Sequence, residues 1–82
     1  MTKPVRYLSA EGKKIDDFGV EFTNEVGENV YDARTKMGPW AMMTEISWQL
    51  YGTGVLGYGH GQRYTRNKTG DLILTSMGDY ND

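Results

Sequence analysis

Pro39-Trp-Ala-Met-Met-Thr-Glu-Ile-Ser-Trp-Gln-Leu-Tyr51, followed by Gly52, is the stretch that decides how this chain folds. Proline suits the first position of a helix, and glycine suits the residue just past its end. Within the stretch, the residues that recur at helical spacing are Trp40, Met43, Ser47, Leu50 and Tyr51, with Ile46 beside them. We therefore predict a helix over Pro39–Tyr51 that packs one face on a sheet.

Two short strands are predicted before this helix. Residues Phe18–Thr23 alternate, with the side chains of Phe18, Val20 and Phe22 on one face, as in a half-buried strand. A turn at Val26–Asn29 leads to a second strand, Val30–Thr35, so the two strands should pair as an antiparallel hairpin. Further upstream, Pro4–Ser9 is typical of an edge strand that opens at a proline.

A second hairpin is predicted after the helix. Gln62–Arg66 and Asp71–Thr75 flank Asn67–Gly70, a short loop with glycine where a positive φ is often required. Glycines at positions 52, 54, 57, 59 and 61 exclude a stable helix or a full strand before this hairpin. We therefore predict an α+β fold, a single domain over residues 1–82, in which a small antiparallel sheet of hairpins packs on one helix. Only the tail Met77–Asp82 should be frayed.

The composition limits both the core and the cellular setting of this domain. A chain of 82 residues has a small core, and the absence of cysteine removes disulfides and thiolate metal sites. Oligomerisation or close packing must then stabilise the fold. The net charge of −2 gives no long-range attraction for nucleic acid or an anionic membrane. No segment has the length and apolarity of a membrane span or a signal peptide, so we expect a cytoplasmic protein.

Sequence motifs for catalysis or cofactor binding are weak. Gly52–Gly57 matches the dinucleotide fingerprint, but it follows a predicted helix rather than a strand. His60 is the only histidine and lacks partners for a metal site or a general base. The acidic residues of the first half do not follow the spacing of a Ca²⁺ loop. We therefore expect a binding protein rather than an enzyme, with no metal and no cofactor.

The predicted helix carries more large apolar side chains than one face can hold. Trp48 and Met42, or Met43 in its place, would need a second layer beyond the sheet. A partner protein or a second protomer could supply it, so a homodimer is one expectation. Tyr58 and His60 lie in the glycine-rich loop, where contacts with partners are common. The sequence therefore predicts a partner-binding site formed by Trp48, Met42, Tyr58 and His60.

The C-terminal hairpin offers an alternative from a different class. Arg63, Arg66 and Lys68 surround Tyr64, and such a patch can hold phosphates and stack a base. The alternative function is therefore nucleic-acid binding. An ordinary charged hairpin would show the same pattern, in keeping with the negative net charge.

About half of the chain, Thr23 to Tyr64, resembles a group of short bacteriophage proteins of zinc-ribbon or treble-clef type. The matching residues are Asp32-Ala-Arg-Thr-Lys-Met-Gly-Pro-Trp-Ala-Met-Met43, then Tyr51-Gly, then Leu56-Gly-Tyr-Gly-His-Gly-Gln-Arg-Tyr64. The resemblance implies a knuckle and hairpin that lead into a helix. It also places the four zinc-ligand cysteines of that family at Thr23, Val26, Thr44 and Ser47, so the zinc is lost and small side chains fill the vacated space.

A phage origin favours a small protein that binds host machinery. The function expected from the sequence is therefore a phage-encoded module that inhibits or modulates a host protein, with a defence system as one such target. This step rests on analogy of origin and not on a catalytic pattern.

Overall fold

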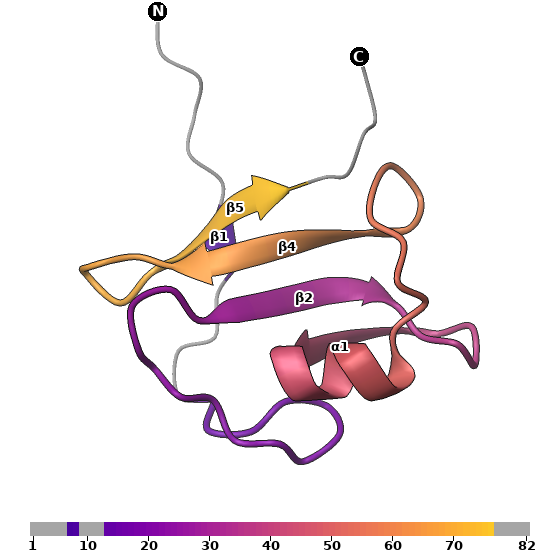
Figure 1. The fold of residues 1–82 in the computed structure, drawn as a ribbon, viewed down its shortest axis with the longest axis horizontal. Helices are drawn as coiled ribbons and strands as arrows, with labels where there is room; N and C mark the ends of the chain where they lie inside the picture. Colours follow the sequence, from indigo (N-terminus) through magenta and orange to yellow (C-terminus); the bar gives the residue numbers. More distant parts are fainter. Residues whose placement is uncertain (1–6, 9–12, 77–82) are drawn as a thin grey trace, which may run out of the picture.

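The computed structural model describes residues 7–8 and 13–76, which form one antiparallel sheet with a short helix on it (Figure 1). The elements in chain order are β1 (Tyr7–Leu8), β2 (Asn29–Arg34), β3 (Trp40–Thr44), α1 (Glu45–Tyr51), β4 (Gly61–Arg66) and β5 (Leu72–Ser76). The strand order across the five-stranded sheet is β1-β5-β4-β2-β3. The predicted α+β class is confirmed.

Strand β2 lies inside the sheet and the C-terminal hairpin extends it. β2 pairs with both β3 and β4, as in Val30 opposite Thr44 on one side and Tyr64 on the other. The predicted strand Val30–Thr35 is thus confirmed to within one residue at each end, and so is the hairpin of β4 and β5. Of the predicted strand Pro4–Ser9, only Tyr7–Leu8 is described, and it forms the sheet edge beside β5. The tail Met77–Asp82 lies outside the described residues.

The predicted helix over Pro39–Tyr51 is wrong in its first half. Residues Trp40–Thr44 form β3, and the helix begins only at Glu45. Thr44 is its N-cap, with extended backbone and a side chain that accepts a hydrogen bond from the Ser47 N–H. The cap sequence Thr-Glu therefore marks the start better than the proline does. At the other end, Gly52 is the C-cap as predicted, with its N–H bonded to the Trp48 carbonyl.

The predicted strand Phe18–Thr23 and its hairpin with Val30–Thr35 are also wrong. Residues 13–28 form an irregular loop with an isolated bridge between Ile15 and Glu21. Gly19 turns the chain at φ 85°, so alternation along the sequence no longer places side chains on one face. The loop instead passes around the outer edge of β3. Phe18 packs with the helix-side cluster, whereas Phe22 joins the cluster of the other face.

Each face of the sheet has its own small core. On the helix side, the buried residues are Tyr31, Ala33 and Met43, against which Trp48 packs. On the opposite face the buried residues are Phe22, Val30, Tyr64 and Leu72. The period-two alternation of a strand explains why neighbours in β2 and β3 go to different cores.

Gly52 gives a test of the packing between α1 and the sheet. A Cβ at this position would lie 2.1 Å from the Trp48 ring, which stacks on Tyr31 with centroids 4.6 Å apart. We expect Gly52→Ala to displace the indole and to lower the free energy of unfolding by about 2 kcal/mol, the usual cost of overpacking. Near-UV circular dichroism should report the lost stack, and urea unfolding the stability. Thr53→Ala, at the exposed next residue, is the control and should leave both signals near those of the wild type.

Candidate functional site

The glycine-rich segment 52–60 and the β2–β3 turn meet at one end of the sheet, where Figure 1 draws both as projecting loops. The Arg34 N–H bonds the His60 carbonyl at 2.9 Å, and the Lys36 N–H bonds the Tyr51 carbonyl at 2.8 Å. Gly38, in the turn, has φ 110°, which a residue with a side chain rarely adopts. Two loops far apart in the sequence are thus held together by backbone bonds. We call this end the loop end.

Large apolar side chains are exposed at the loop end. Met37 is 68% exposed, Tyr58 72%, Val55 47% and Trp40 44%. Methionine and aromatic residues are the types enriched where proteins bind one another. Met37 and Trp40 belong to the β2–β3 hairpin, and Val55 and Tyr58 to the glycine-rich loop whose base is bonded to it. Exposed apolar groups of this size are candidates for an interaction site.

The charge of the loop end is positive. Arg34 and Lys36 are both exposed, as is His60. From residue 33 to residue 70 the sequence contains a single acidic residue, Glu45, which lies at the first turn of α1. By contrast, residues 13–28 contain five acidic residues: Asp16, Asp17, Glu21, Glu25 and Glu28. The acidic loop reaches the middle of the β2–β3 hairpin, where Asp17 bonds Met42 and where burial, then the Asp17 charge, raises the pKa of Asp32. The cations Arg34 and Lys36 lie nearer the turn.

The four partner-binding residues predicted from the sequence divide into two pairs. Tyr58 and His60 are exposed at the loop end, and the structure brings Arg34 beside His60. Trp48 and Met42 are instead half-buried and pack within this chain, so their role in partner binding stays a prediction. Trp48 stacks on Tyr31, and Met42 packs against the core of the opposite face because it belongs to a strand.

Met37, Trp40 and Val55 are the residues that the sequence interpretation missed at this end. The predicted helix puts Trp40 on its inner face, but the helix begins only at Glu45. A helix start at the Thr44-Glu45 pair makes the preceding residues a strand and its turn, with Met37 at the hairpin tip.

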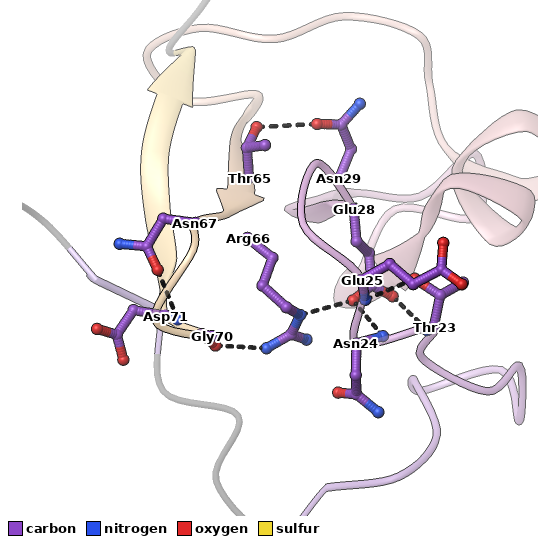
Figure 2. A network of polar contacts seen from close by, with 10 residues as sticks. All are labelled: Thr23, Asn24, Glu25, Glu28, Asn29, Thr65, Arg66, Asn67, Gly70 and Asp71. Atoms are coloured by element: carbon purple, nitrogen blue, oxygen red, sulfur yellow. Dashed lines mark hydrogen bonds and ion pairs between the residues drawn. The ribbon is translucent and has the colours of Figure 1, made fainter.

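The four residues of the basic hairpin do not gather on one surface. Tyr64 is 5% exposed and belongs to the core, while Arg66 is 8% exposed. Figure 2 shows the Arg66 guanidinium between two partners, the Glu28 carboxylate at 2.8 Å and the Gly70 carbonyl at 2.7 Å. Arg63 is half-buried and donates to the Thr75 hydroxyl, whereas Lys68 is exposed in the turn. Two of the four side chains therefore hold the fold together.

Figure 2 also shows how Glu28 orders the acidic loop. Its carboxylate accepts the N–H groups of Thr23 and Asn24 at 2.7 and 3.1 Å, in addition to the Arg66 guanidinium. The side chains of Arg66 and Glu28 are only 9% and 5% exposed. One buried ion pair thus fastens residues 23–28 to the β4–β5 hairpin.

Asp16 bonds Thr44 and Ser47, two of the four positions that the resemblance aligns with zinc-ligand cysteines. Its carboxylate accepts the Thr44 N–H and hydroxyl at 2.8 and 2.9 Å and the Ser47 hydroxyl. These two small side chains therefore do more than fill space, because both are bonded to a carboxylate from a distant loop. The other two positions are not buried as Thr44 and Ser47 are. Val26 is 66% exposed, and Thr23 is an exposed loop residue.

The Asp16 carboxylate is buried, and each of its hydrogen bonds comes from an N–H or O–H donor. The Phe18 and Val20 N–H groups add bonds of 2.8 and 3.0 Å. Burial alone would raise the pKa of Asp16, but the bonds from Ser47 and from backbone N–H groups outweigh it and hold the pKa below its usual value. Asp16 is therefore ionised at neutral pH, and its bonds join the loop to the start of α1.

A second polar group lies between α1 and β2. The Tyr31 hydroxyl donates to Glu45 at 2.8 Å, and Gln49 donates to the same carboxylate at 2.8 Å. Burial, followed by the bond to Glu45, raises the pKa of Tyr31 to about 12. Burial would also raise the pKa of Glu45, but the bonds from Gln49 and Tyr31 lower it. Both groups thus keep their usual protonation states at neutral pH and position the helix.

One half-open pocket of about 240 Å³ lies between the acidic loop and the start of α1. Its lining includes Glu28 and Glu45, whose carboxylates are already bonded to Arg66 and Tyr31. Within residues 13–76, no three histidine, acidic or cysteine side chains are arranged to hold a metal ion. In the described part of the chain, α1 is too short to cross a membrane.

No family model, no curated protein and no solved structure matches this chain. The resemblance to zinc-ribbon phage proteins thus stays a prediction. The geometry itself defines the class as a small α+β domain with an exposed basic and apolar end.

Proposed function

We propose that this chain is a phage-encoded protein-binding module that occupies a surface of a bacterial host protein and so inhibits or modulates it. A component of a host defence system is the kind of target we expect. The observation that supports this proposal is the loop end, where Met37 and Trp40 are exposed on the β2–β3 hairpin and Val55 and Tyr58 on the loop bonded to its base. Binding and occlusion need no metal, cofactor or catalytic group.

The residues that carry the resemblance to the phage proteins form this same end. The segment Lys36-Met-Gly-Pro-Trp-Ala41 makes the β2–β3 turn and the start of β3, and residues 56–61 make the neighbouring loop. Lys36, Met37 and Tyr58 are exposed and do not form the core. A binding function at the surface would explain why these residues occur together. The proposed binding surface therefore contains Tyr58 and His60, together with Met37, Trp40 and Val55.

Site-specific photo-crosslinking in bacterial cells tests this proposal. We expect p-benzoylphenylalanine in place of Tyr58 to give discrete protein adducts, whereas the same group in place of Thr69, exposed in the β4–β5 turn, should give none. Met37→Ser should lower the adduct yield about fivefold, the effect of losing roughly 1 kcal/mol of binding energy. Val26→Ser is the matched control, because Val26 is 66% exposed but lies in the acidic loop. The proposal fails if positions 58 and 69 give the same adducts.

Nucleic-acid binding and a homodimer remain the two other predictions. Since Arg66 and Tyr64 are buried, nucleic-acid binding would rest on Arg63 and Lys68. A homodimer could form through α1, where the exposed Ile46 and Leu50 lie one helical turn apart. The loop end offers more exposed apolar and basic groups than either of these.

A further inference from the structure

The loop end has positive charges that form no ion pair with any residue the structure describes. Among residues 13–76, the ion pairs join Lys13 to Asp17 and Arg66 to Glu28, and neither involves Arg34 or Lys36. Arg34 lies directly opposite Trp40 in the β2–β3 register, so the two side chains share a face of the sheet. A cation beside an exposed indole is thus built into the hairpin.

We propose that the partner segment that binds the loop end is acidic and carries aromatic or aliphatic side chains. This inference rests on the proposed function and adds the chemistry of the partner. Carboxylates would pair with Arg34 and Lys36, while apolar side chains would contact Met37 and Trp40. Charge complementarity of this kind directs association and selects the partner.

A nucleic acid fits the same surface less well. Nucleic-acid sites need a series of cations that follow the backbone, whereas Arg63 and Arg66 are held within the sheet and Lys68 lies in the β4–β5 turn. Trp40 and Tyr58 offer rings on which a base could stack, but only the cations Arg34 and Lys36 accompany them, too few to follow a phosphate backbone. Two exposed cations among apolar groups are better matched by a protein surface.

Recognition by side chains is favoured because most of the β3 edge is already bonded within the chain. At the outer edge of β3, the Met42 N–H donates to the Asp17 carboxylate at 2.7 Å and the Met42 carbonyl accepts the Asp17 N–H at 3.0 Å. The Thr44 N–H is bonded to Asp16. These bonds leave no ladder of free groups for an added strand along this edge.

The test is an NMR titration of the labelled full chain with a random copolymer of glutamate and tyrosine. We expect amide shifts confined to residues 34–40 and 55–60, and weaker binding as salt rises from about 0.05 to 0.2 M. The charge-reversal variant Arg34→Glu/Lys36→Glu should weaken binding at least about tenfold, as expected when paired charges become like charges. Lys14→Glu/Lys68→Glu makes the same change in net charge at exposed sites elsewhere and should bind like the wild type.

Three results would overturn the inference. The first is the absence of shifts with the copolymer, and the second is equal weakening by the two charge-reversal variants. The third is tighter binding of a poly(dT) oligonucleotide at residues 34–40, which would make the partner a nucleic acid. The photo-crosslinking result separates this failure from that of the proposed function, because protein adducts at Tyr58 without copolymer binding would contradict only the acidic chemistry.

Discussion

Replacing Asp16 with asparagine should lower the free energy of unfolding by about 3 kcal/mol. The carboxylate accepts hydrogen bonds from three backbone N–H groups and two hydroxyls. In asparagine, one of the two oxygens becomes an amide that donates, so it meets other donors in a buried site. Buried donors left without acceptors are costly, whereas shape is almost unchanged. Urea unfolding followed by tryptophan fluorescence measures the loss.

Asp17→Asn is the matched control for this prediction. Asp17 is adjacent and also bonds β3, through the Met42 N–H, but its side chain is 44% exposed. Water screens such a group, so the loss should stay below about 1 kcal/mol. Equal losses in the two variants would contradict the role we assign to Asp16.

The acid side of the stability curve gives a second measurement on the same variant. Because the folded-state pKa of Asp16 lies below its usual value of 3.8, the unfolded chain takes up this proton first as the pH falls. The contribution of Asp16 is therefore complete above about pH 5 and is lost as the pH falls through the lowered pKa. The stability difference between wild type and Asp16→Asn should narrow over this range. A difference that is independent of pH would indicate that Asp16 acts through its shape alone.

Replacing Arg66 with methionine should lower the free energy of unfolding by about 3–5 kcal/mol, the range found when one partner of a buried ion pair is removed. The variant loses the bonds to Glu28 and to the Gly70 carbonyl. It also leaves the Glu28 carboxylate, 5% exposed, with only the N–H groups of Thr23 and Asn24. Residues 23–28 and the β4–β5 turn should loosen together, which amide hydrogen exchange would show.

Two further variants control this prediction. Lys68→Met removes an exposed cation from the same turn and should change the stability by less than about 0.5 kcal/mol. Glu28→Gln/Arg66→Met should be less destabilising than the sum of its single variants, since the two side chains share one interaction. Additive losses of unfolding free energy would mean that the two side chains are not coupled.

The result also bears on nucleic-acid assays, because a loss of binding in an Arg66 variant would report unfolding rather than a lost phosphate contact.

Local turn and strand signals predicted a large part of this fold correctly. The β4–β5 hairpin follows from the glycine of its turn, Gly70, which has φ 90°. β2 follows from its short run of strand-forming residues, and the helix end from Gly52. Each of these signals acts within a few residues, so no distant contact is needed to see it.

Predictions from the spacing of apolar residues were wrong where a helix, a strand or a loop could each produce the same spacing. The stripe Trp40, Met43 and Ser47 fits a helix, yet Trp40 and Met43 lie on opposite faces of a strand that pairs with β2. Similarly, Phe18 and Phe22 could share a strand face, but their loop crosses the sheet edge and each joins a different core. Both outcomes depend on long-range pairing of β3, which overrides the local pattern.

For the candidate site, the sequence by itself predicted a binding surface with exposed aromatic groups, and that function stays a prediction. It placed Tyr58 and His60 in a glycine-rich loop, because repeated glycines exclude regular structure. Only the tertiary structure decided which other residues join them. The β2–β3 turn meets that loop through the backbone bonds of Arg34 and Lys36, while Trp48 turns inward onto Tyr31. The physical reason is that exposure depends on which distant strand a residue pairs with, and a single sequence does not contain that information locally.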